Sequence, residues 1–134
     1  MGTPRWFVRF LSDRALWEGR YVDLWSIPHL MSGALVAYLL IWLGFDFWNS
    51  FGIGIGIGVL WELFEKVTAL SSTEFATNSL TDILFAQAGF LTSWYAWHML
   101  APGDAKAVAW AVLVFFGICV VLGWISFTYY RSVG

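Results

Sequence analysis

Long runs without a charged residue dominate the chain and predict its architecture. Three of these runs lie between Asp23 and Asp46, between Asp82 and Asp104, and between Lys106 and Arg131. Each run reaches the ~20 residues that an α-helix needs to cross ~30 Å of hydrocarbon. A fourth run, at 47–61, is shorter and becomes long enough when the helix continues to Lys66.

These runs predict four membrane-spanning helices, at about residues 27–45, 48–67, 80–100 and 106–129. The connections at 46–50 and 101–105 are short, and Pro102-Gly103 is a turn signal in the second. The longer polar connection at 69–79 offers Asn78 or Ser79 as a helix N-cap. Because short loops place consecutive helices as antiparallel neighbours, we expect an all-α, polytopic integral membrane protein that forms a four-helix bundle over residues 27–134.

The segment at 1–26 precedes this bundle and has a different pattern. Thr3-Pro4 is typical of a helix start, with proline at the first helical position. At helical spacing one face carries aromatic side chains and another carries charges: Trp6, Phe10 and Trp17 against Arg5, Arg9 and Asp13. We therefore predict an N-terminal interfacial amphipathic helix on the cytoplasmic membrane surface. A basic leader that only sets the topology is the alternative.

Composition supports the membrane class and narrows the function. The chain has 134 residues, of which 60% are hydrophobic, 20% aromatic and 12% charged. A soluble domain has about a quarter charged residues, and one of this size could not bury so much apolar surface. The net charge of −2 provides no basic field for nucleic acid. Cys119 is the only cysteine, which excludes an internal disulfide.

The basic residues predict the orientation. One side of the predicted bundle holds six of them, and the other side holds only Lys106. The six are Arg5, Arg9, Arg14, Arg20, Lys66 and Arg131. Basic residues favour the cytoplasmic side, so we expect both termini in the cytoplasm.

Alternating glycines mark the second predicted helix. Gly52, Gly54, Gly56 and Gly58 alternate with isoleucines, without the strand context and lysine of a phosphate-binding loop. In a membrane helix they form two small-xxx-small pairs, Gly52/Gly56 and Gly54/Gly58, on nearly opposite faces. Such pairs allow close helix packing. We expect close approach on both faces, with one face also able to receive a partner subunit.

Polar residues cluster at the predicted cytoplasmic end of three helices: His29, Glu62, Glu65, Asn78 and Asp82. Ionisable groups at membrane depth usually face the bundle interior or water. The simplest interpretation is that these side chains staple the helices together. A binding site for a lipid headgroup or a proton path is the second interpretation, and a metal site is the third. Since di-iron bundles use Glu-x-x-His and this chain has Glu62-x-x-Glu65, we predict no metal.

The two histidines bear on cofactors. His29 and His98 lie at opposite ends of the predicted bundle, so they cannot both ligate one haem. A single histidine could hold a chlorophyll-type pigment, but each has a tryptophan one turn before it, Trp25 or Trp94, rather than a small residue. We therefore predict no cofactor.

Three short motifs follow one another along the chain. They are Pro28-His29-Leu30-Met31-Ser32-Gly33, then Trp61-Glu62-Leu63-Phe64-Glu65, then Asn78-Ser79-Leu80-Thr81-Asp82 with a later Gly89. Together they resemble the VanZ-like family of small bacterial membrane proteins. The resemblance covers roughly residues 27–90. Trp25 and Ala86 stand where that family usually has an acidic residue and an asparagine. The resemblance implies a bacterial inner-membrane protein of a kind sometimes linked to envelope or glycopeptide-antibiotic phenotypes, without an established reaction.

No nucleophile-elbow, His-Glu-x-x-His or kinase-type motif occurs in the sequence. We therefore expect a non-enzymatic accessory or scaffold subunit that packs against a larger membrane complex, with lipids and other membrane subunits as partners. The alternative is an independent VanZ-like envelope or lipid-interacting protein that uses the His/Glu/Asp cluster.

Overall fold

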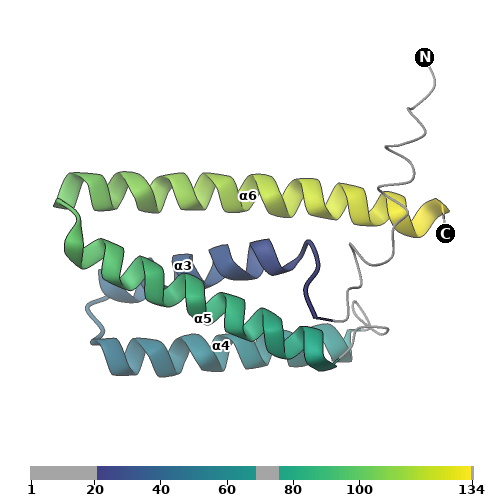
Figure 1. Cartoon of the computed structure of the whole chain (residues 1–134), viewed down its shortest axis with the longest axis horizontal. Helices are drawn as coiled ribbons and strands as arrows, with labels where there is room; N and C mark the ends of the chain where they lie inside the picture. The colour runs from purple at the N-terminus through teal and green to yellow at the C-terminus, as the bar shows by residue number, and fades with distance from the viewer. Residues whose placement is uncertain (1–20, 69–75, 134) are drawn as a thin grey trace, which may run out of the picture.

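The part of the chain that the computed structural model describes, residues 21–68 and 76–133, contains four helices and no strand. The helices are α3 (Ser26–Trp42), α4 (Phe47–Val67), α5 (Ala76–Met99) and α6 (Pro102–Val133). They alternate in direction, so each runs antiparallel to the next (Figure 1). The all-α prediction is confirmed. Most of the predicted interfacial helix, up to residue 20, lies outside the described residues.

Helices α3 and α5 form the centre of the arrangement, because they make the most extensive contact with each other and each also packs against α4 and α6. Two helices are long and apolar enough to cross a membrane by length and composition, namely Phe47–Val67 and Pro102–Ser126. The most apolar stretch of α6 contains no buried residue. Helix α3 is also apolar but has only 17 residues.

A glycine ends α3 earlier than the expected residue 45. Gly44 has a φ of 81°, which favours glycine, and its N–H donates to the Ile41 carbonyl at 3.0 Å. The Phe45 N–H donates to the Leu40 carbonyl, also at 3.0 Å. This pair of hydrogen bonds is the Schellman motif, which satisfies the last carbonyls of a helix and stops it.

An aspartate starts α4 directly after this turn. The Asp46 carboxylate accepts hydrogen bonds from the backbone N–H groups of Trp48 and Asn49, at 3.0 and 3.2 Å. Hydrogen bonding from the Asn49 side chain, and then from these backbone groups, holds the pKa of Asp46 below its ordinary value. Asp46 is therefore an N-cap that fixes the first turn of α4.

Helix α6 begins at Pro102, where a loop at 101–105 was predicted from the Pro102-Gly103 pair, so that prediction was wrong. Proline suits the first position of a helix, since its missing N–H would have no partner there and its fixed φ is already helical. The turn signal was in fact a helix-start signal.

Two glycines allow α3 and α5 to approach until their backbones nearly touch. A Cβ atom added at Gly33 would lie 1.8 Å from the carbonyl oxygen of Ala86, and one added at Gly89 would lie 1.8 Å from that of Leu30. No side chain fits between backbones at this separation. The two helices cross at these positions because both residues are glycine.

The glycine row of α4 divides into a packed face and an open face. A Cβ at Gly54 would lie 3.4 Å from a ring carbon of Phe90, and one at Gly58 would lie 3.8 Å from Ile83, both on α5. Around Gly52 and Gly56 a Cβ would meet nothing within 4 Å among the described residues. Contacts made by these glycines within this part of the chain therefore involve the Gly54 and Gly58 face.

An aromatic core fills the end of the bundle near the α3–α4 turn. Ala37 and Leu40 of α3 and Phe90 and Trp94 of α5 are buried there. The Phe90 and Trp94 rings stack with centroids 5.7 Å apart, and Phe51 of α4 meets Phe90 edge-on at 5.8 Å. This apolar packing holds one end of the helices together, whereas the other end is polar.

Candidate polar site at one end of the bundle

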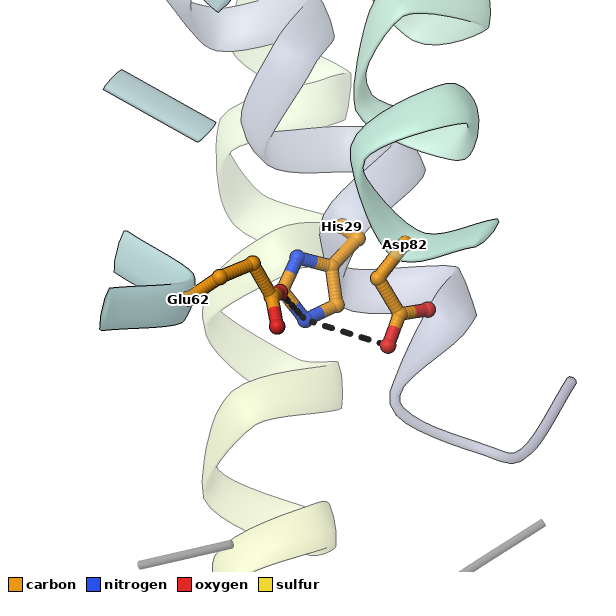
Figure 2. A group of neighbouring side chains, drawn as sticks. All are labelled: His29, Glu62 and Asp82. Carbon is orange, nitrogen blue, oxygen red and sulfur yellow. Dashed lines mark ion pairs between the residues drawn. The ribbon is translucent and has the colours of Figure 1, made fainter. Parts of the chain in front are cut away.

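Three side chains from three helices converge at the end opposite the aromatic core. His29 comes from the first turn of α3, Glu62 from the last third of α4 and Asp82 from the second turn of α5. His29 Nε2 lies 3.9 Å from Glu62 Oε1 and 3.8 Å from Asp82 Oδ2. Figure 2 shows the two carboxylates facing the same ring nitrogen from opposite sides. The up-and-down topology brings these helix ends together, as the sequence predicted.

The converging groups are shielded from solvent by the surrounding helices. Glu62 is 5% exposed and Asp82 is 1% exposed, and the His29 side chain is 14% exposed. Carboxylates are almost never buried to this extent unless other groups compensate their charge. The His29 imidazole is one group that lies close to both carboxylates.

Asp82 is fixed by two hydrogen-bond donors. The Ser26 hydroxyl donates to Asp82 Oδ1 at 2.7 Å, and the Asn78 side-chain amide donates to Oδ2 at 3.2 Å. The same Asn78 nitrogen donates to Asp23 Oδ2 at 3.0 Å. Asp23 in turn accepts from the Trp25 backbone N–H at 2.8 Å. The hydrogen bonds from Ser26 and Asn78 thus hold the Asp82 carboxylate in one orientation.

Asn78 has a different role from the predicted helix cap. It lies within α5, which begins at Ala76, and it is completely buried against the acidic residues. Ser79, the other proposed cap, is also inside the helix and 4% exposed. The cap prediction was wrong because the helix begins earlier. Both polar residues instead face the interior of the bundle, where they are buried.

Asp23 and Ser26 were missed by the sequence analysis. Both precede the predicted start of the first membrane helix at residue 27, so they were assigned to the segment before the bundle. Asp23 itself was a signal, because an aspartate shortly before an apolar run is typical of a helix start. The Ser26 side chain is 1% exposed.

Glu65 does not join the three converging groups. It is intermediate in exposure, and its Oε1 accepts a hydrogen bond from Trp61 Nε1 at 2.8 Å within α4. Lys66, beside it, is exposed. His29, Glu62 and Asp82 therefore lie close together, and Asn78 contacts this group through Asp82. Glu65 lies on the outer side of α4.

His98 lies at the far end of α5 from the polar site. The stretch from Asp82 to His98 is roughly 24 Å long at ~1.5 Å per helical residue. His98 is exposed, and its Nδ1 lies 2.7 Å from the Trp94 carbonyl oxygen. The two histidines are thus too far apart to share one haem.

The distances at His29 limit what the arrangement can do. A good N–H···O hydrogen bond measures ~2.7–3.2 Å, and both Nε2–carboxylate separations are longer. In addition, Nε2 has one N–H at most, which cannot point at carboxylates on two sides. The geometry is that of three donor groups around a common centre: one ligand atom from each of His29, Glu62 and Asp82 lies within 4.8 Å of the others.

Comparison of the chain with protein-family models, curated proteins and solved structures gave no match. The functional argument therefore proceeds from geometry. The resemblance to VanZ-like proteins over residues 27–90 stays a prediction.

Proposed function

We propose that the chain is a small, non-enzymatic integral membrane protein that serves as an accessory or scaffold subunit of a larger membrane complex. In this proposal all four helices cross a bacterial inner membrane and both termini are cytoplasmic. The apolar outer surface of α6 then faces lipid, and the polar site lies towards the cytoplasm.

The observation that carries the proposal is the open glycine face of α4. Glycine in a helix interior costs ~0.5–1 kcal/mol relative to alanine. Gly54 and Gly58 offset this cost by packing against α5, whereas Gly52 and Gly56 meet nothing within 4 Å among the described residues. Small residues four positions apart allow another helix to approach closely in a membrane. In this proposal a helix of a partner subunit packs against Gly52 and Gly56.

Purification in mild detergent tests this proposal. We expect the chain to co-purify with other membrane subunits at fixed stoichiometry, which mass spectrometry identifies. Gly52→Ile and Gly56→Ile should abolish the association without unfolding the isolated chain, because both positions are open. Ala88→Ile, which adds the same bulk at an exposed position on α5, is the matched control and should leave the association intact. Purification as a lone protein, or association unaffected by both substitutions, would contradict the proposal.

A second candidate function rests on the convergence of His29, Glu62 and Asp82. In it the chain acts independently, as a VanZ-like envelope or lipid-interacting protein, and uses the buried cluster to bind a ligand. Ser26 and Asp82 already join α3 and α5 by a direct hydrogen bond, whereas both separations between His29 Nε2 and the carboxylates exceed hydrogen-bond range. A lone protein that retains lipid through purification would favour this candidate over the first.

A further inference from the structure

We propose that His29, Glu62 and Asp82 form a binding site for one divalent transition-metal ion. This inference rests on the second candidate function, whose ligand it identifies as a cation. Each of the three residues comes from a different helix, so a bound ion would join α3, α4 and α5 at their polar end.

The spacing of the donor atoms suits such an ion. Bonds of ~2.0–2.2 Å from a metal to nitrogen and carboxylate oxygen place neighbouring ligand atoms about 3.0–3.5 Å apart. The two separations from His29 Nε2 are 3.9 and 3.8 Å. The ligand atoms of all three residues lie within 4.8 Å of one another. Side-chain adjustment of Glu62 and His29 would draw the donors together around Asp82, which is already held by Ser26 and Asn78.

The charge of the donor set indicates a divalent ion. Two carboxylates and a neutral imidazole carry a charge of −2, which one divalent cation balances. Buried charges are tolerated where they are paired or coordinate a metal.

The chemistry of the donors selects among divalent ions. Imidazole favours zinc, iron and similar transition metals, whereas sites for Mg²⁺ and Ca²⁺ are built from oxygen alone. Zinc binds histidine nitrogen and carboxylate oxygen, and zinc sites that keep one position open have three protein ligands, the number this cluster offers. Zn²⁺ is therefore the ion we assign, and Co²⁺ is its spectroscopic substitute.

The side chains that contact the proposed ligands are arranged as they are around metal-binding residues in other proteins. Ligating carboxylates are themselves hydrogen-bonded, and loss of such a partner typically weakens metal affinity 10–100-fold. In this protein the Ser26 hydroxyl contacts Asp82 Oδ1, whereas Oδ2 is the oxygen that lies near His29 Nε2. Ser26 would thus orient a ligand without itself touching the ion.

Metal titration of the full chain in lipid nanodiscs tests the proposal. The protein is first stripped with a chelator and then titrated with Co²⁺, followed by its visible absorption bands, and Zn²⁺ is added to displace the cobalt. We expect one Co²⁺ per chain. His29→Gln, Glu62→Gln and Asp82→Asn should each lose the absorption bands. Glu65→Gln, which removes a nearby carboxylate outside the cluster, should retain them.

A variant that leaves all three ligands in place guards against unfolding of the others. Ser26→Ala should bind Co²⁺ about 10–100-fold more weakly with the same band positions. Absence of saturable Co²⁺ binding by the wild-type chain, or equal binding by the wild type and the three ligand variants, would overturn the proposal. Lipid is quantified in the same preparations. Lipid retained without metal would refute the metal site and leave the second candidate function standing. Metal bound by a chain that co-purifies with other membrane subunits at fixed stoichiometry would contradict that function and leave the metal site standing.

Discussion

The crossing of α3 and α5 yields the sharpest prediction for stability. Gly33→Ala and Gly89→Ala each add one methyl group at the point where the two backbones meet. The added Cβ would lie 1.8 Å from a backbone carbonyl oxygen, while observed Cβ contacts are essentially never shorter than 3.0 Å. The helices must therefore separate at the crossing by at least the difference between these two distances, because a backbone oxygen cannot rotate away as a flexible side chain can.

The expected cost follows from this separation. Overpacking in a well-packed interior costs ~1–3 kcal/mol, and we expect each substitution to lie at or above the upper end because backbone rather than side chain must move. Gly56→Ala is the matched control, since the same methyl group there meets nothing within 4 Å among the described residues. The free energy of unfolding should rise by up to ~1 kcal/mol in this variant, because alanine has the higher helix propensity.

The assay is thermal unfolding of the purified full chain in one detergent, followed by tryptophan fluorescence and by the fraction that stays monodisperse after heating. The predicted order of stability is Gly56→Ala at or above wild type, and Gly33→Ala and Gly89→Ala well below it. Wild-type stability in both crossing variants would refute the close approach of α3 and α5. A general loss in all three variants would show that methyl groups are poorly tolerated everywhere, so that the crossing is not special.

Two further predictions concern the ends of the bundle. Phe90→Ala should lower the free energy of unfolding by ~3–5 kcal/mol, because Phe90 is 0% exposed and contacts both Phe51 and Trp94. Denaturant titration measures this free energy, and a decrease below ~1 kcal/mol would contradict the aromatic core. Zn²⁺ at about a hundredfold excess over its dissociation constant should stabilise the fold by ~2.7 kcal/mol. The readout is a rise in melting temperature that a chelator reverses in wild type; an equal rise in Glu62→Gln would contradict binding at the cluster.

Charge-free runs predicted the approximate positions of the helices, since each of α3, α4, α5 and α6 overlaps one predicted span. The ends were less predictable, since local hydrogen bonds decide them. Gly44 stopped α3 before residue 45, and Pro102 started α6 where a turn was expected. In both cases one backbone preference outweighed the hydrophobic pattern.

The sequence predicted which residues lie at the same end of the bundle, but not which of them face inward. Helix alternation alone is enough to bring His29, Glu62 and Asp82 to one end of the bundle. It cannot show which side of a helix faces inward to within one residue, and Glu65 accordingly lies on the outer side of α4. The Gly33 and Gly89 contact was also beyond the pattern, because close approach depends on how two helices cross in space.

The central claim, that four helices cross the membrane with the polar site on the cytoplasmic side, is tested most directly by cysteine accessibility. In a Cys119→Ser background, Leu43→Cys and Gly103→Cys mark the exposed connections at one end, and Thr68→Cys marks the other end. A membrane-impermeant maleimide should label the first two in intact spheroplasts, and the third only after permeabilisation. Labelling of Thr68→Cys from outside, protection of the other two, or recovery of the protein in the soluble fraction would contradict the account.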